Sequence, residues 1–254
     1  MTVATAPDVG PAPGVGHARG WHAATAAIAW ASVALQLFYS AVGEPGDGLT
    51  MGVRVFRFFS YFTILSNIVV AGVTTALALN PARNGRVFRV LRLDSLVMIT
   101  VTGLIYAFVL AGLYEVVGVG RNLANDGLHY VTPTLTVLAF LVVGPRLRWR
   151  VPEVFGALVL PLIWVAYILA QGAVTHWYPY PFMDVNDLGY AMVFANIAGI
   201  VLVGVVFGFG FFGVDRGLLR LRRGPADVAT GAGAAPGSTG ADEVQDLDEE
   251  GERV

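Results

Sequence analysis

The apolar segment from Phe56 to Leu79 restricts the fold of this chain more than any other feature of its sequence. It is long enough to cross a bilayer as a helix, which takes about 20 residues. Its polar residues fall within about 60° of one another on a helical wheel, and they are Ser60, Thr63, Asn67 and Thr74. Lipid offers no hydrogen-bond partners, so such a stripe has to face protein or a wet cavity. The segment therefore predicts a membrane helix that lines an interior space.

The composition is that of an integral membrane protein. Of the 254 residues, 56% are hydrophobic and 13% are charged, whereas a soluble domain has about 25% charged residues. There is no cysteine, which excludes disulfides and thiolate chemistry. All 16 basic residues are arginine, and Ala, Gly and Val are abundant, which is typical of a high-GC bacterial gene. The expected location is therefore the bacterial plasma membrane.

The apolar runs predict an all-α, polytopic bundle of about six transmembrane helices. The expected spans are Trp21–Val42, Phe56–Leu79, Leu93–Val117, Leu128–Val143, Val154–Val174 and Leu188–Phe212, within a transmembrane domain of residues 21–215. Residues 1–20 are rich in Pro, Gly and Ala and predict a disordered tail. Residues 224–254 are Gly/Ala-rich and then acidic, so we expect a second disordered tail that cannot bury enough apolar area to fold.

Arginines lie mainly on one side of these expected spans. That side carries Arg19, Arg83, Arg86, Arg89, Arg92, Arg146, Arg148, Arg150, Arg216, Arg220, Arg222 and Arg223. The other side carries only Arg54, Arg57 and Arg121. Because cytoplasmic loops hold the excess of basic residues, both termini are expected in the cytoplasm.

The fourth expected span is short and contains Pro133. A helix that began at the proline would be too short to cross the bilayer, so we expect it to begin near Asn125, with Asp126 as its cap and a bend at Pro133. A proline leaves the carbonyl four residues earlier without a donor, and that residue is His129. His129 should therefore lie beside an opened backbone in the outer part of the bundle.

Polar side chains gather in the half of the spans away from most of the arginines. Three of them, Asn67, Gln171 and Asn196, lie too deep to be interfacial residues. We infer a polar cavity that opens to the outer side. Its expected lining or supporting residues are Ser60, Asn67, Asp126, Gln171, Tyr180, Asp184 and Asn196.

Thr63 and His129 are the candidate pair for chemistry. A threonine hydroxyl becomes a nucleophile when a base takes its proton, and histidine is the usual base. Their depth in the expected bundle suits a lipid ester that enters from the leaflet. The alternative is that Thr63 bonds its own backbone, as threonines in membrane helices often do, and that His129 is an interfacial residue.

Other chemistry has little support in the sequence. The glycine-rich run at residues 208–213 matches a dinucleotide fingerprint by letter, but it closes an expected membrane span and follows no strand. The histidines and acids His129, His176, Asp184 and Asp187 lack diagnostic metal-ligand spacing. We therefore expect no cofactor, no metal ion and no nucleic-acid partner.

Three short motifs resemble, in matching order, segments of the androgen-induced membrane protein family. They are Phe62–Asn67, Asn125–His129 followed by Pro133, and Trp177–Asp184, and the similarity covers residues 25–215. Animal members of the family are multi-span threonine hydrolases of fatty acid esters of hydroxy fatty acids. The resemblance, which extends to a bacterial branch, implies Thr63 as nucleophile, His129 as base and a membrane lipid as substrate. Asp126 stands where a second histidine of the family is expected.

Three functions remain open. In the leading one, a lipid ester hydrolase, Thr63 attacks and His129 takes its proton, within about 5 Å of each other. Asn67 would donate to the oxyanion, and Asp126 would orient His129. The alternatives are a non-enzymatic carrier of a lipid or small molecule, which uses the same cavity, and a scaffold subunit, whose polar stripes are fully paired with one another.

Overall fold

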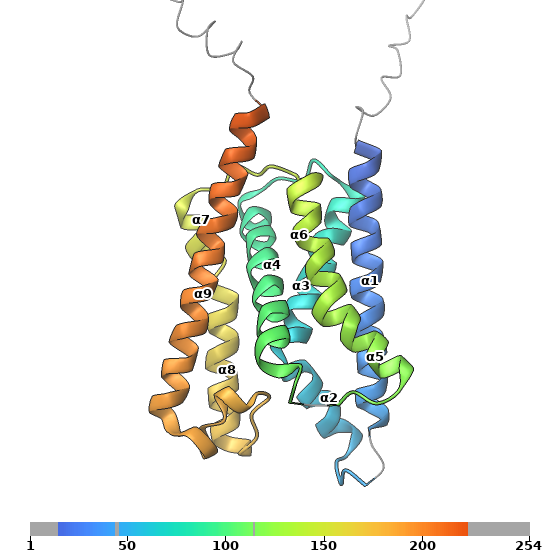
Figure 1. Ribbon diagram of the computed structural model, residues 1–254, viewed down its shortest axis with the longest axis vertical. Coiled ribbons are helices and arrows are strands. Elements are labelled where there is room, and N and C mark those ends of the chain that lie inside the picture. Colours follow the sequence, from blue (N-terminus) through green and yellow to red (C-terminus); the bar gives the residue numbers. More distant parts are fainter. Residues whose placement is uncertain (1–14, 44–45, 114, 223–254) are drawn as a thin grey trace, which may run out of the picture. The chain divides into compact units, whose positions relative to one another are not determined.

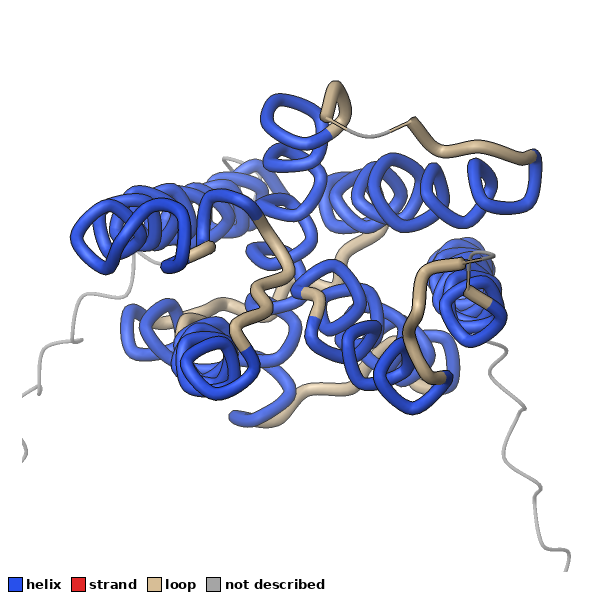
Figure 2. Tube along the Cα trace, turned by 90° about the horizontal axis from the view of Figure 1, so that it is seen from below, coloured by secondary structure: helices blue, strands red, loops and turns tan. Residues whose placement is uncertain are grey.

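The computed structural model describes residues 15–43, 46–113 and 115–222, and within these ranges the chain is helical and without strands (Figures 1 and 2). The α-helices are α1 (Val15–Val42), α2 (Met51–Ser60), α3 (Phe62–Leu79), α4 (Arg86–Ile105), α5 (Val119–Asp126), α6 (Thr132–Val142), α7 (Val151–Gly156), α8 (Val159–Thr175) and α9 (Val185–Arg222). Two π-helices, η1 (Tyr106–Leu110) and η2 (Gly127–Val131), and one 3₁₀-helix, η3 (Pro181–Met183), connect them. The chain divides into two units, and all the sites described here belong to the first, Met1–Gly217.

Five helical segments of the described residues are long and apolar enough to cross a membrane, as an integral membrane protein requires. They are Val15–Val42, Phe62–Leu79, Arg86–Leu110, Val151–Thr175 and Val185–Leu221. The expected all-α class is confirmed. The fourth expected span is built from α5, η2 and α6 in series, with 8, 5 and 11 residues, and each piece alone is shorter than the roughly 20 residues of a full crossing.

The first helix begins earlier than expected. Residues 15–20, assigned to a disordered tail from their composition, form the first turns of α1. The Arg19 guanidinium donates to the carbonyl of Leu79 at 3.3 Å, at the last residue of α3, and this contact joins the early turns of α1 to the bundle. Residues 1–14 and 224–254, the rest of the expected tails, lie outside the described residues.

The second expected span is interrupted, which corrects the prediction of one helix over Phe56–Leu79. Tyr61 has extended backbone angles (φ −75°, ψ 131°) and separates α2 from α3. The sequence has no proline or glycine at this point, and a distant contact fixes the break. The indole nitrogen of Trp164, on α8, donates to the carbonyl of Ser60 at 3.0 Å. Thr63 therefore lies in the first turn of a helix and not in its interior.

The helical segment that contains Pro133 begins earlier in the sequence than predicted. Gly118, with φ 100°, precedes α5, so the helix begins at Val119 and Asp126 is its last residue and not a cap. The π-helix η2, which contains His129, comes immediately before the turn with Pro133. A π-helix widens one turn of the backbone, so the predicted opening at His129 takes this form.

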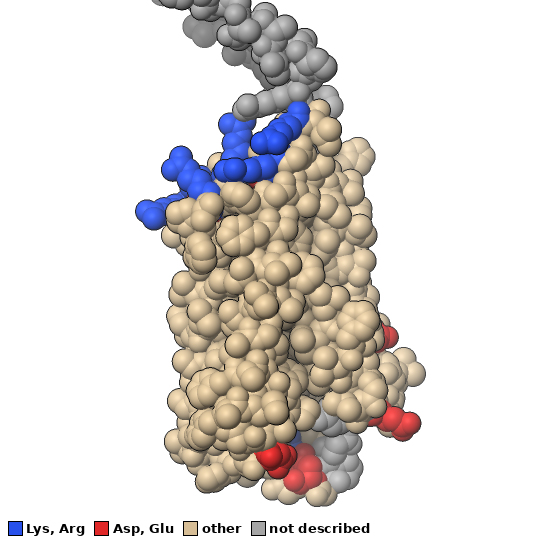
Figure 3. All heavy atoms as spheres, turned by 60° about the vertical axis from the view of Figure 1, so that its left-hand side comes forward, with Lys and Arg blue, Asp and Glu red and all other residues tan. Residues whose placement is uncertain are grey.

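Side-chain packing places α4 in the middle of the first unit, with α1, α5 and α6 on one side and α8 and α9 on the other (Figure 1). Gly103 allows α4 to approach the fourth span closely, because a Cβ atom there would lie 3.2 Å from Pro133 and 3.3 Å from the carbonyl of His129. On the face drawn in Figure 3, arginine side chains gather at one end of the helices and acidic side chains toward the other.

Candidate functional site

Thr63 is almost fully buried, with 7% of its surface exposed, and contacts side chains from two other elements. Its Oγ1 lies 3.3 Å from Nε2 of His129 and 3.4 Å from the hydroxyl of Tyr180. The predicted approach of Thr63 to His129 within about 5 Å is therefore confirmed as geometry. Within the described residues, Thr63 Oγ1 makes no hydrogen bond to a backbone carbonyl, because the break at Tyr61 puts the residue four positions earlier in a different helix.

His129 presents the correct nitrogen to Thr63. Its Nδ1 lies 3.0 Å from the backbone carbonyl of Asn125. Because a carbonyl only accepts hydrogen bonds, Nδ1 carries the proton, and a neutral ring then has an acceptor lone pair on Nε2, the atom that faces Thr63. The imidazole also stacks on the Tyr106 ring, with centroids 3.8 Å apart and planes 18° from parallel. The amide of Asn125 donates to the Tyr106 hydroxyl at 2.6 Å, which holds that ring in place.

Tyr180 comes from the loop between α8 and α9 and contacts Thr63 twice. Its hydroxyl accepts from the Thr63 N–H at 3.3 Å and lies near Thr63 Oγ1. Burial raises the pKa of Tyr180 to about 12, although the hydrogen bonds with Thr63 act in the opposite direction. The phenol therefore stays neutral at ordinary pH and keeps a proton to donate beside the Thr63 hydroxyl.

Three of the expected lining or supporting residues, Gln171, Asp184 and Asn196, support the loop that carries Tyr180. The amide of Gln171 donates to the Trp177 carbonyl at 2.8 Å, and the amide of Asn196 donates to the Phe182 carbonyl at 2.9 Å. Asp184 closes the loop by accepting from the backbone N–H of Asn186, at the start of α9, at 2.9 Å. These contacts fix the two ends of the segment that carries Tyr180.

Asn67 and Ser60 also hold parts of the bundle together through hydrogen bonds. Asn67 is fully buried, and its amide donates to the carbonyls of Thr63 at 2.8 Å and Leu128 at 3.2 Å. Because both amide protons are used, the expectation that Asn67 donates to an oxyanion is wrong in this arrangement. Ser60 donates to the carbonyl of Phe56 at 3.0 Å and lies 3.1 Å from the hydroxyl of Tyr167, which joins the end of α2 to α8.

Asp126 does not orient His129 through a hydrogen bond, since none joins the two residues in the described part of the chain. The Asn125 carbonyl has that role. Asp126 is the last residue of α5, three positions before His129, and its side chain is exposed.

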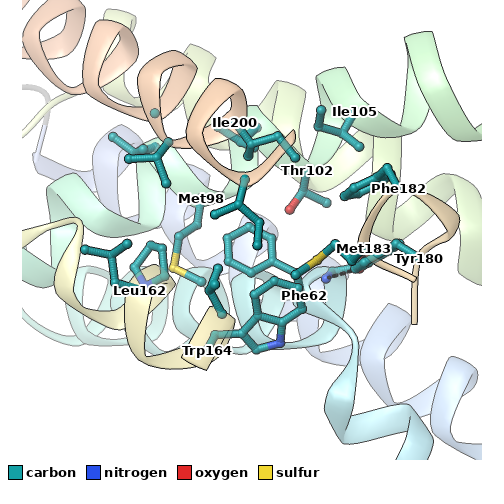
Figure 4. Close-up of a pocket in the computed structure, with 18 of the residues that line it drawn as sticks. Phe62, Met98, Thr102, Ile105, Leu162, Trp164, Tyr180, Phe182, Met183 and Ile200 are labelled. Atoms are coloured by element: carbon teal, nitrogen blue, oxygen red, sulfur yellow. Dashed lines mark hydrogen bonds between the residues drawn. The ribbon is translucent and has the colours of Figure 1, made fainter. Parts of the chain in front are cut away.

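Two cavities of different character meet at Thr63. The first is apolar, has a volume of about 90 Å³ and lies among α3, α4, α8 and α9, whose side chains point toward one another in Figure 4. Its lining includes Phe62, Met98, Thr102, Ile105, Leu162, Trp164, Phe182, Met183 and Ile200. The second is larger, about 670 Å³, and much more polar. Its lining includes Gln36, Ser40, Tyr106, Glu115, Arg121, Asn125, His129, Trp177 and Tyr178. Thr63, Leu110 and Tyr180 line both.

The sequence reasoning missed two contributions to this site. One is Tyr106, because nothing in its spacing in the sequence indicates that its ring stacks on His129. The Asn125 carbonyl lies four residues before His129, in the motif that was recognised, but backbone groups leave no mark in a sequence.

Among the described residues, no group of three or more His, Cys, Asp or Glu side chains could hold a metal ion. Comparisons with protein-family models, with curated proteins and with solved structures found no match for this chain.

Proposed function

We propose that this protein hydrolyses a lipid ester, with Thr63 as nucleophile and His129 as general base. One observation carries the proposal: Thr63 Oγ1 lies between the acceptor nitrogen of His129 and the hydroxyl of Tyr180, where a polar and an apolar cavity meet. A nucleophile needs a base within hydrogen-bond reach, and the base needs a third group that orients it. Here that third group is the Asn125 carbonyl.

The chemistry runs in two halves. Thr63 Oγ1 attacks the ester carbonyl carbon while its proton passes to Nε2 of His129. The resulting oxyanion accepts a hydrogen bond from Tyr180, and then the alcohol leaves with the proton from His129. Water attacks the acyl-threonine with His129 as base, which releases a carboxylic acid and restores the Thr63 hydroxyl.

The cavities suggest how an ester would be placed. Its alkyl chain would occupy the apolar cavity, and its polar part would remain in the larger cavity on the side of His129. At about 90 Å³ the apolar cavity holds only a few methylene groups, so a longer chain requires side chains such as Met98 to shift, and methionine adapts readily. The proposed substrate class is therefore a fatty acyl ester from the membrane.

We also propose the number of membrane spans and their orientation. With α5, η2 and α6 as one crossing, the chain would have six spans, both termini in the cytoplasm of a bacterium and the Thr63 site toward the outer side. The distribution of arginines along the sequence supports this orientation. The resemblance of three motifs to the androgen-induced membrane protein family supports the hydrolase and a place beside that family's bacterial branch.

The scaffold alternative explains part of the molecule. Asn67, Gln171 and Asn196 are indeed paired, with backbone carbonyls. It does not explain why, in the described part of the chain, the hydrogen-bond partners of the Thr63 hydroxyl are side chains of other elements. The carrier alternative uses the same cavities but predicts binding without bond cleavage.

A direct test uses the purified full chain with p-nitrophenyl octanoate and a fluorophosphonate probe. The wild type should release p-nitrophenol and take up the probe, Thr63→Ala should do neither, and Thr63→Ser should retain part of both activities. Undiminished labelling of Thr63→Ala would remove Thr63 as the nucleophile. Binding of an octanoyl ester without hydrolysis by the wild type would favour the carrier.

A further inference from the structure

Arg92 is a buried cation at the other end of the bundle. It lies in α4, roughly 20 Å along the helix from Tyr106 at 1.5 Å per residue. Its side chain is fully buried, and within the described residues all three guanidinium nitrogens lack a hydrogen-bond partner. A buried arginine is normally paired with an acid or bonded to carbonyls, because an uncompensated charge is costly to bury.

Two further nitrogen-bearing side chains approach Arg92 from other elements. His22 from α1 and Arg146 from the segment between α6 and α7 are both near enough to interact electrostatically with Arg92. His22 is fully buried; its Nε2 donates to the Gly144 carbonyl at 3.1 Å, so Nδ1 of the neutral ring is an acceptor and cannot contact an anion. Arg146 donates to the Leu141 carbonyl at 2.6 Å.

The acidic residues nearby do not neutralise Arg92. Asp215 from α9 faces Arg146, and its Oδ2 accepts from the backbone N–H of Arg148 at 3.0 Å. Asp94 is two positions after Arg92 on α4, which places it about 200° around the helix. Within the described residues, positive charge around the buried Arg92 therefore exceeds negative charge.

We propose that Arg92, with Arg146, binds a phosphate-type anion. A guanidinium presents several N–H donors in a fixed plane that matches two oxygens of a phosphate group. The two side chains come from α4 and the segment before α7, so a bound anion would link parts of the chain that are distant in sequence. Trp149 donates to the Arg89 carbonyl at 2.9 Å and packs this segment over the start of α4, so access of an anion to the buried Arg92 requires the segment to move.

The phosphate group could be the headgroup of an acidic phospholipid or a free inorganic ion, and two experimental arms separate these sources. In the first, the full chain in detergent is unfolded by heat, followed by tryptophan fluorescence, while phosphate replaces chloride at constant ionic strength. In the second, the same unfolding is followed in mixed micelles with phosphatidic acid and with diacylglycerol, which lacks only the phosphate, and native mass spectrometry counts the retained lipid.

The expected result is a saturable rise of several degrees in the unfolding midpoint, with phosphate or with phosphatidic acid, because a ligand that binds only the folded state stabilises it. Arg92→Met should abolish the rise. Arg86→Met is the matched control: it removes an exposed arginine from the first turn of the same helix, and it should keep the rise. Without anion, Arg92→Met should unfold no earlier than the wild type, since it removes an uncompensated charge.

Arg146→Met provides a second variant if Arg92→Met fails to fold, and it should raise the phosphate or lipid concentration needed for half-saturation several-fold. A rise with phosphatidic acid alone assigns the site to a lipid headgroup, and a rise with inorganic phosphate assigns it to a soluble anion. The proposal is overturned if neither ligand shifts the wild-type midpoint, or if both shift Arg92→Met as much as the wild type.

Discussion

Thr63 and Thr74 lie on the same face of α3, and both are buried, yet their hydroxyls have different partners. Thr74 donates to the carbonyl of Val70, one turn earlier, at 2.7 Å. Thr63 instead contacts His129 and Tyr180. The difference comes from position, because Thr74 has a helical carbonyl four residues before it and Thr63, in the first turn, has none. A threonine in a membrane helix becomes available for chemistry when the helix starts just before it.

The helix start gives Thr63 a second advantage over Thr74. The first N–H groups of a helix have no intrahelical partner, and the helix dipole places partial positive charge there. Negative charge that develops on a substrate at Thr63 would be stabilised by this end of α3. No such field exists at Thr74, in the interior of the same helix.

The largest expected effect distinguishes the two threonines by activity. Thr63→Ala and His129→Ala should each lower kcat/KM for ester hydrolysis by about 10³-fold or more, and the double variant should be little worse, because the two residues act as one unit. Thr74→Ala should stay within about twofold of the wild type, since its hydroxyl bonds only its own helix. Independent, multiplying losses in the double variant would contradict the pairing of Thr63 with His129.

The second-largest effect on activity is expected at Tyr180, whose hydroxyl lies beside Thr63. Tyr180→Phe should lower kcat by roughly 10²-fold with little change in KM, as expected when one donor to an oxyanion is lost. Because the pKa of Tyr180 is about 12, its hydroxyl keeps its proton through the neutral and mildly alkaline range. The loss should therefore be the same at every pH in that range. A larger change in KM than in kcat would instead indicate a role in binding.

A smaller effect is expected at Asn67, where a substitution should lower stability and leave catalysis nearly unchanged. Asn67→Ala should lower the free energy of unfolding by about 1–3 kcal/mol, because it removes two buried hydrogen bonds. The kcat of the folded fraction should stay within a few-fold of the wild type. Chemical denaturation and active-site titration measure the two quantities separately. A fall in kcat of about 10²-fold at unchanged stability would restore Asn67 as an oxyanion donor.

The smallest effect is expected at Asp126. Asp126→Asn should change kcat/KM by no more than about twofold, because a backbone carbonyl orients His129 and the exposed charge of Asp126 is screened by solvent. The ester-hydrolysis assay measures this change in kcat/KM. A loss comparable to that of His129→Ala would show that Asp126 holds the imidazole after all.

The sequence allowed the helical class, most of the apolar spans and the Thr63–His129 approach to be predicted. Apolar length is a local property, and a polar stripe with a proline four residues after a histidine restricts where the two can meet. The break at Tyr61 could not be predicted, because it depends on Trp164, about 100 residues away. The role of Tyr180 was missed for the same reason, since it depends on how the loop after α8 folds back onto α3.

The two π-helices, η1 and η2, lie opposite one another where Tyr106 stacks on His129. A π-turn contains one residue more than an α-turn, so it acts as a single-residue insertion in the helical phase. Removing one residue from η2 before His129 would restore α-helical phase and rotate the preceding α5 by about 100° relative to α6. Asn125, on α5, would then no longer present its carbonyl to Nδ1 of His129. The number of residues between Gly118 and Pro133 is therefore as much a requirement of the site as their identity.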